Sequence, residues 1–201
     1  PQQRSDVSSL FSTRVIQGHD NLRLAAEMIL PSPVLDEFSQ QVEPERTFVR
    51  YEVRLAVRRG DPLSTGLQLR LVNEQLSPIP SAKDHLRFPD SAAYVNRFVH
   101  GAHKFFPLST TEENGNTIIQ IQNGSRGRPR KIAANNAQRT VLSATASAEN
   151  PIILAAQAEM RSWRFVALEP SAMRAPDDVV EARPISATGA HIPSSLFRQE
   201  L

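Results

Sequence analysis

Apolar and polar residues alternate in three segments of the chain, residues 21–30, 47–58 and 67–72. A period of two is typical of a strand with one face buried and the other in water. The apolar side chains that would share the buried face are Leu22, Leu24, Ala26, Met28 and Leu30, then Val49, Tyr51, Val53, Leu55 and Val57, then Leu67, Leu69 and Leu71. Because the connections are short, we expect an antiparallel meander.

The middle of the chain mixes turn signals with shorter apolar runs. Pro31 and Pro33 end the first strand, and Ser32 can cap a short helix over residues 34–38. Residues 77–110 combine prolines with scattered aromatic side chains, and we expect an insertion lying over the sheet. A turn at residues 112–116 precedes a short strand at 117–122, and residues 123–127 would form the tip of its hairpin.

The second half of the chain changes period. After a strand-like start from Arg139, the apolar side chains of residues 154–160 recur with the spacing of an amphipathic helix. Trp163, Phe165 and Leu168 follow in a nearly continuous apolar run that ends at Pro170, which predicts a buried strand. We expect Trp163 to be a core residue whose replacement by Ala costs about 3–5 kcal/mol.

Composition narrows the class of protein. With 201 residues, 40% of them hydrophobic and 22% charged, the chain is long and apolar enough for one globular domain. The 15 prolines disfavour long helices, and the absence of cysteine excludes disulfides, thiol catalysis and cysteine zinc sites. No apolar run approaches the ~20 residues that span a bilayer, so we expect a cytoplasmic protein without a membrane partner.

The sharpest cluster of charge is the segment from Ser125 to Lys131. Its glycine and its proline favour an irregular loop, and both guanidinium groups and backbone N–H groups bind phosphate. One interpretation is therefore a loop that contacts the nucleic-acid backbone through Arg126, Arg128, Arg130 and Lys131. The other is a solvated hairpin tip, because charge runs are usually solvated faces, and a net charge of +2 does not decide between them.

The sequence predicts no catalytic residue and no metal site. A phosphate-binding loop of the form G-x-x-x-x-G-K-[ST] is absent, and none of the three lysines follows a glycine. Asp177 and Asp178 follow Pro176 and precede only a short apolar pair, so we expect them in a solvated loop. We therefore expect the chain by itself to bind neither ATP nor magnesium and to show no ATP hydrolysis.

Four motifs, in their order along the chain, resemble those of RecF/SMC-like, ABC-class bacterial ATP-binding proteins of the AAA group. They are Tyr51–Leu55, Ser125–Arg130, the segment RTVLSATASAENPIILAAQAEMRSWRFVALEPSAMRAPDD at residues 139–178, and Gly189–Arg198. The resemblance implies an α+β fold, the antiparallel β-rich part of an ATPase head lobe with a few short helices. Residues 1–124 would form this part, with the insertion at 77–110, followed by a basic loop at 125–140 and the helix, Trp strand and exit segment at 141–201.

The same resemblance implies a function. The chain would be an internal segment of an ATPase that couples ATP binding and hydrolysis to DNA repair, chromosome maintenance or anti-phage defence. ATP and magnesium would be held by the rest of the head, two heads would dimerise, and DNA and a nuclease would be partners. His191 would position the helix that follows it. The alternative is a non-enzymatic module that binds nucleic acid or a protein partner through the sheet and the Arg-rich segment.

Overall fold

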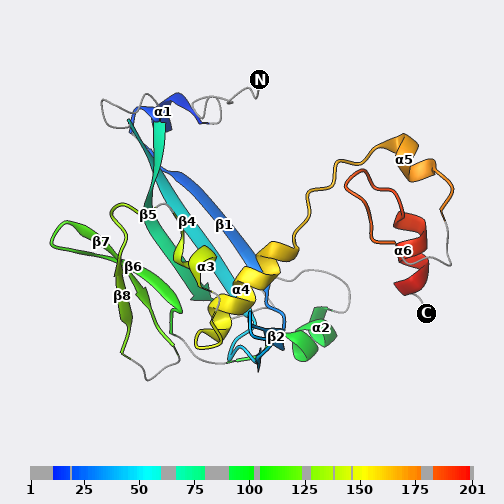
Figure 1. Cartoon of the computed structure of the whole chain (residues 1–201), viewed down its shortest axis with the longest axis horizontal. Helices are drawn as coiled ribbons and strands as arrows, with labels where there is room; N and C mark the ends of the chain where they lie inside the picture. Colours follow the sequence, from blue (N-terminus) through cyan, green and yellow to red (C-terminus); the bar gives the residue numbers. More distant parts are fainter. Residues whose placement is uncertain are drawn as a thin grey trace. The chain divides into compact units, whose positions relative to one another are not determined.

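A six-stranded antiparallel sheet forms the framework of the first part of the chain (Figure 1). The computed structural model describes residues 11–18, 20–59, 67–79, 91–101, 105–123, 128–137, 139–145, 147–177 and 183–199. The chain divides into two units, Pro1–Arg161 and Ser162–Leu201, and each is described by itself.

The strand order is β1–β4–β5–β6–β7–β8, and each strand is antiparallel to its neighbours. This order confirms the predicted meander and the α+β class with few short helices. The strands are β1 (Leu22–Ile29), β4 (Phe48–Arg59), β5 (Leu67–Pro78), β6 (Leu108–Glu113), β7 (Asn116–Ile121) and β8 (Arg130–Ala133). Two short helices, α1 (Thr13–Ile16) and α2 (Ser91–Phe98), complete the unit together with the elements below, and α2 lies within the predicted insertion.

The helix predicted after Ser32 is wrong. A second, two-stranded sheet, β2 (Val34–Leu35) paired with β3 (Gln41–Val42), occupies this region. The side chain of Asp36 explains the difference, because its Oδ1 accepts the N–H groups of both Phe38 and Gln40 at 2.8 Å. A short acidic side chain that bonds nearby backbone N–H groups stabilises a turn in competition with a helix.

The core lies between one face of the large sheet and two helices, α3 (Val141–Ala144) and α4 (Pro151–Ser162) (Figure 1). Helix α4 confirms the predicted amphipathic helix and buries residues 152–157. The strand-like start predicted from Arg139 is wrong, because residues 141–144 form α3. The side chain of Thr140 caps this helix by accepting the N–H of Ser143 at 3.2 Å.

A β-bulge changes which side chains of β5 face the core. Arg54 pairs with Asn73 while Leu55 pairs with Leu71, so Val72 is an additional residue on β5. Because side chains alternate between faces, one extra residue reverses the pattern beyond it. Glu74 therefore lies on the same face as Leu71, opposite the core residue Val53.

The second unit contains α5 (Pro170–Arg174) and α6 (Ile192–Gln199). The predicted buried strand at residues 163–168 is wrong. Trp163, Phe165 and Leu168 are 49%, 89% and 60% exposed, and residues 163–168 belong to no strand. The N–H groups of Ala167 and Glu169 donate to the carbonyl oxygens of residues 187 and 188. The apolar run is therefore not enclosed by the described residues around it.

Candidate functional site: a groove between β7, β8 and α3

A buried carboxylate holds the start of α3. Glu74 is fully buried on β5, and its Oε2 and Oε1 accept the backbone N–H groups of Val141 and Leu142 at 2.7 and 2.8 Å. The hydroxyl of Tyr51 donates to the same carboxylate at 3.2 Å. Burial raises the pKa of Glu74, and the three donors oppose this by stabilising the charged form. The pKa of Tyr51 is also raised, chiefly by burial and then by the neighbouring charge of Glu74.

A buried amide holds the other end of the same helix. Nε2 of Gln157, on α4, donates to the carbonyl oxygens of Leu142 and Ser143 at 2.9 and 3.1 Å. Terminal N–H and C=O groups of a helix have no partner within the helix. Because both sets are satisfied by buried side chains from β5 and α4, this four-residue helix has a defined position.

Helix α3 forms one wall of a groove whose other wall is the β7–β8 ribbon. The groove encloses about 310 Å³. Isoleucines of β7 and β8 supply apolar surface to the groove. Arg130 on β8 and Arg139, which directly precedes Thr140, also line it. The described lining residues are Ile119, Ile121, Arg130, Ile132, Ala134, Ala137, Arg139, Thr140, Val141, Ala144, Thr145, Ser147, Glu149 and Asn150.

The predicted nucleic-acid residues fall into three structural settings. Arg126 lies outside the described residues, and Arg128 is exposed just before β8. Arg130 and Lys131 are exposed on β8 itself, so the predicted basic loop at 125–140 contains a strand. Nζ of Lys131 pairs with Glu113 of β6 at 2.5 Å, which partly neutralises its charge.

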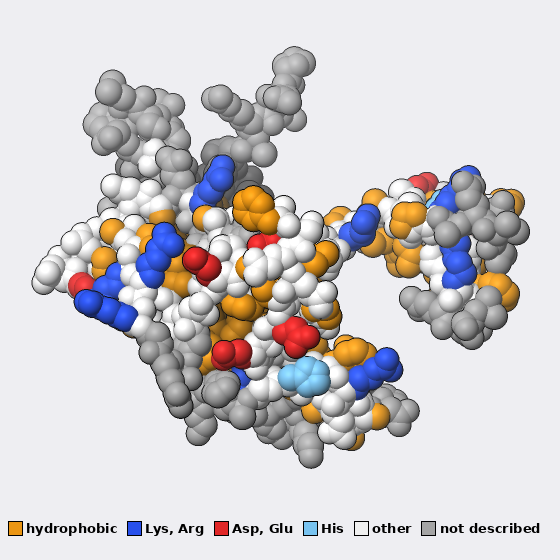
Figure 2. Space-filling model, turned by 60° about the horizontal axis from the view of Figure 1, so that its bottom comes forward, with side chains coloured by type: hydrophobic (Ala, Val, Ile, Leu, Met, Phe, Trp, Pro, Cys, Tyr) orange, Lys and Arg blue, Asp and Glu red, His pale blue; other side chains and the backbone are white. Residues whose placement is uncertain are grey.

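Arg139 is the basic lining residue that the sequence analysis did not include among the nucleic-acid residues. It is exposed, and it stands eight residues beyond the end of the basic cluster at Lys131. The turn after β8 brings it to the groove beside Arg130. Figure 2 shows blue Lys and Arg side chains on the β6–β8 side of the sheet, with hydrophobic side chains visible next to them.

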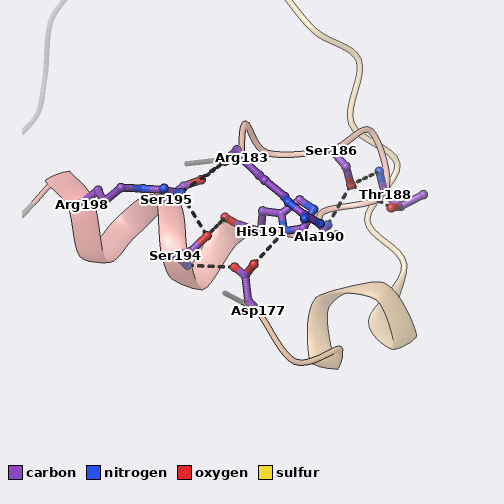
Figure 3. A network of polar contacts seen from close by, with 9 residues as sticks. All are labelled: Asp177, Arg183, Ser186, Thr188, Ala190, His191, Ser194, Ser195 and Arg198. Atoms are coloured by element: carbon purple, nitrogen blue, oxygen red, sulfur yellow. Dashed lines mark hydrogen bonds and ion pairs between the residues drawn. The ribbon is translucent and has the colours of Figure 1, made fainter. Parts of the chain in front are cut away.

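The second unit holds a separate polar network (Figure 3). Oδ1 of Asp177 lies 2.7 Å from Nδ1 of His191, and Oδ2 accepts the backbone N–H of Ser194 in the first turn of α6 at 3.1 Å. The pKa of Asp177 is lowered to about 2, first by the hydrogen bond from His191 and then by those from Ser194. The side chain of Asp177 is only 9% exposed, so the prediction of a solvated loop is wrong for this residue.

The residues Asp177, His191 and Ser194 resemble an acid–histidine–serine set in type but not in geometry. The hydroxyl of Ser194 donates to the carbonyl oxygen of His191 at 3.3 Å, and Nη2 of Arg198 donates to the same hydroxyl at 3.2 Å. A nucleophilic serine needs its hydroxyl bonded to the imidazole. The network therefore fixes the start of α6, in agreement with the positioning role expected of His191.

Scans of the chain against family models, curated proteins and solved structures each found no match. The described residues contain no group of three His, Cys, Asp or Glu side chains that could hold a metal ion. None of the helices in the described ranges is both long and apolar enough to cross a bilayer.

Proposed function

We propose that this chain is the β-rich lobe of a RecF/SMC-like ATP-binding protein, and that the groove between β7, β8 and α3 contacts the nucleic-acid backbone. The antiparallel sheet covered by α4 supports the first part, since the resemblance implies this order of elements. Nucleotide hydrolysis is not assigned to this chain, because its sequence contains no G-x-x-x-x-G-K-[ST] phosphate-binding loop.

One observation carries the nucleic-acid part of the proposal: Arg130 and Arg139 line the same groove from two separate segments. A guanidinium presents several N–H donors in a plane and binds phosphate oxygens in pairs. Arg128, exposed just before β8, adds positive charge near Arg130, whereas Lys131 alternates to the other face of the sheet and pairs with Glu113. Helix α3, held by Glu74 and Gln157, keeps the wall beside Arg139 in place, and a preorganised wall reduces the ordering cost of binding.

The composition of the groove favours backbone contact over reading of bases. Its described lining includes isoleucines, alanines and two arginines but no aromatic ring on which a base could stack. Glu149 is the only acidic side chain in that lining, and it would repel phosphate. The proposal therefore requires an affinity that varies little with the nucleic-acid sequence. The affinity should fall when the charge of Arg130 is removed and rise when that of Glu149 is removed.

The test is the affinity of the chain for a labelled DNA duplex, measured by fluorescence anisotropy. We expect Arg130→Gln and Arg139→Gln to weaken binding equally on two unrelated sequences, and Glu149→Gln to strengthen it. Arg97→Gln, an exposed arginine on α2, and Glu112→Gln, an exposed glutamate on β6, are the matched controls. Equal effects of groove and control substitutions would leave the solvated-surface interpretation of the basic residues.

The non-enzymatic alternative shares this groove but differs in its response to nucleotide. A lobe of an ATPase should change its DNA affinity when ATP and magnesium are supplied to the protein assembled with the remainder of its head. A stand-alone binding module should give the same affinity with and without nucleotide. Comparison of the two conditions in that assembly separates the alternatives.

A further inference from the structure

The two edges of the large sheet differ in how they are protected. The β8 edge has four residues, of which Arg130 and Lys131 are charged, and short charged edges resist further pairing. The β1 edge has eight residues, contains no proline, and keeps an uninterrupted register with β4. Among the described strands, β1 pairs only with β4. Alternate N–H and C=O groups of an edge strand point away from its partner, so β1 directs a row of backbone groups away from β4.

The charged side chains of β1 are directed inward along the sheet. Nη2 of Arg23 bonds Oε2 of Glu52 at 2.6 Å, and Nη1 of Arg50 bonds Oε1 of Glu27 at 2.9 Å. On the opposite face Leu24, which pairs with the core residue Val53, is 53% exposed. An apolar side chain on the core face of an open edge gains from an added strand that extends the covered surface.

We propose that β1 pairs with β1 of a second copy of the chain, antiparallel and centred on Ala25. In this register Arg23 lies opposite Glu27 of the copy, Leu24 opposite Ala26, and Leu22 opposite Met28. Directly opposite residues of an antiparallel pair lie on the same face, so opposite charges meet on the outer face and apolar side chains meet on the core face.

Neighbouring registers lack this match. Centring the pair on Leu24 or Ala26 leaves Arg23 opposite Ala25 or Ile29, and centring it on Arg23 or Glu27 places like charges together. Shifts that oppose an odd-numbered to an even-numbered residue turn the core face of one copy onto the outer face of the other. Charge and burial thus select one register and one two-fold axis, which makes the second copy the occupant that the edge fits best.

Cysteine cross-linking tests the register directly, because the chain has no native cysteine. Residues opposite each other in an antiparallel pair have Cα atoms about 4.5–5.5 Å apart, within the range a disulfide can join. We expect Ala25→Cys to form a covalent dimer under mild oxidation. Ala133→Cys, an exposed alanine on the β8 edge, is the matched control and should form no covalent dimer.

Analytical ultracentrifugation of the unmodified chain supplies the second measurement. We expect a concentration-dependent species of twice the 22.3 kDa chain mass, and in the same range of concentration slower hydrogen exchange of β1 amides. Circular dichroism confirms that each variant is folded. A monomer at all concentrations with no excess cross-linking over Ala133→Cys would overturn the proposal. So would a dimer that fails to cross-link through residue 25, since another segment would then form the interface.

Discussion

At the scale of the residue, Glu74 connects the sheet to the candidate groove, because its two carboxylate oxygens each accept a backbone N–H of α3. We expect Glu74→Gln to lower the free energy of unfolding by about 1–3 kcal/mol, since an amide has one acceptor oxygen and would present its NH₂ group to the second backbone N–H. Urea denaturation measures the change, and Glu112→Gln on the exposed part of β6 is the control. Equal stability of the two variants would show that the carboxylate contributes no more than a surface glutamate.

Glu52 gives a prediction on pH. Hydrogen bonds from Arg23 and Arg54 hold its pKa at about 2, below the ordinary value of 4.5. The stabilisation is therefore complete above about pH 4.5 and is lost as pH falls towards 2. We expect the free energy of unfolding of wild type to exceed that of Glu52→Gln by about 1 kcal/mol at neutral pH. The value is modest because the arginines are partly exposed. A difference in free energy of unfolding between the two proteins that does not shrink between pH 5 and about pH 2 would contradict this.

At the scale of the element, α3 is too short to persist without its tertiary contacts. We expect Gln157→Met to leave the carbonyl oxygens of Leu142 and Ser143 without their donor and to speed hydrogen exchange of the Leu142 amide. The amides of β4 should keep their protection. Gln75→Met, on the sheet face opposite Glu74, is the matched control. Unchanged exchange at Leu142 would show that the bond to Gln157 does not hold the helix.

Elements were predictable from the sequence where one period persists. The alternation around Tyr51 identified β4, and the helical spacing after Pro151 identified α4. The bulge at Val72 was not visible, because one extra residue appears in a sequence only as a break in alternation. The run from Trp163 to Leu168 was misread because periodicity shows which residues are apolar but not whether enough chain surrounds them.

At the scale of the whole molecule, the candidate groove depends on segments that folding brings together. Arg130 belongs to a cluster that the sequence displays, whereas Arg139 stands outside it and could be recognised only once β8, the turn and α3 were in place. The clamp by Glu74 and Gln157 joins residues more than eighty positions apart, which no local pattern reveals. The sequence therefore indicated the sheet and Arg130 of the groove. The structure adds the wall formed by α3 and the second arginine, Arg139.

The salt dependence of DNA binding tests the central claim most directly. If Arg130 and Arg139 contact phosphates, each contact releases condensed counterions, and log affinity falls with log salt concentration with a slope of about 0.9 per contact. We predict that the slope for the double variant Arg130→Gln/Arg139→Gln on duplex DNA is flatter than that of wild type by roughly 1.8, while Arg97→Gln keeps the wild-type slope. A double variant whose slope and affinity equal those of wild type would contradict the claim that this groove binds nucleic acid.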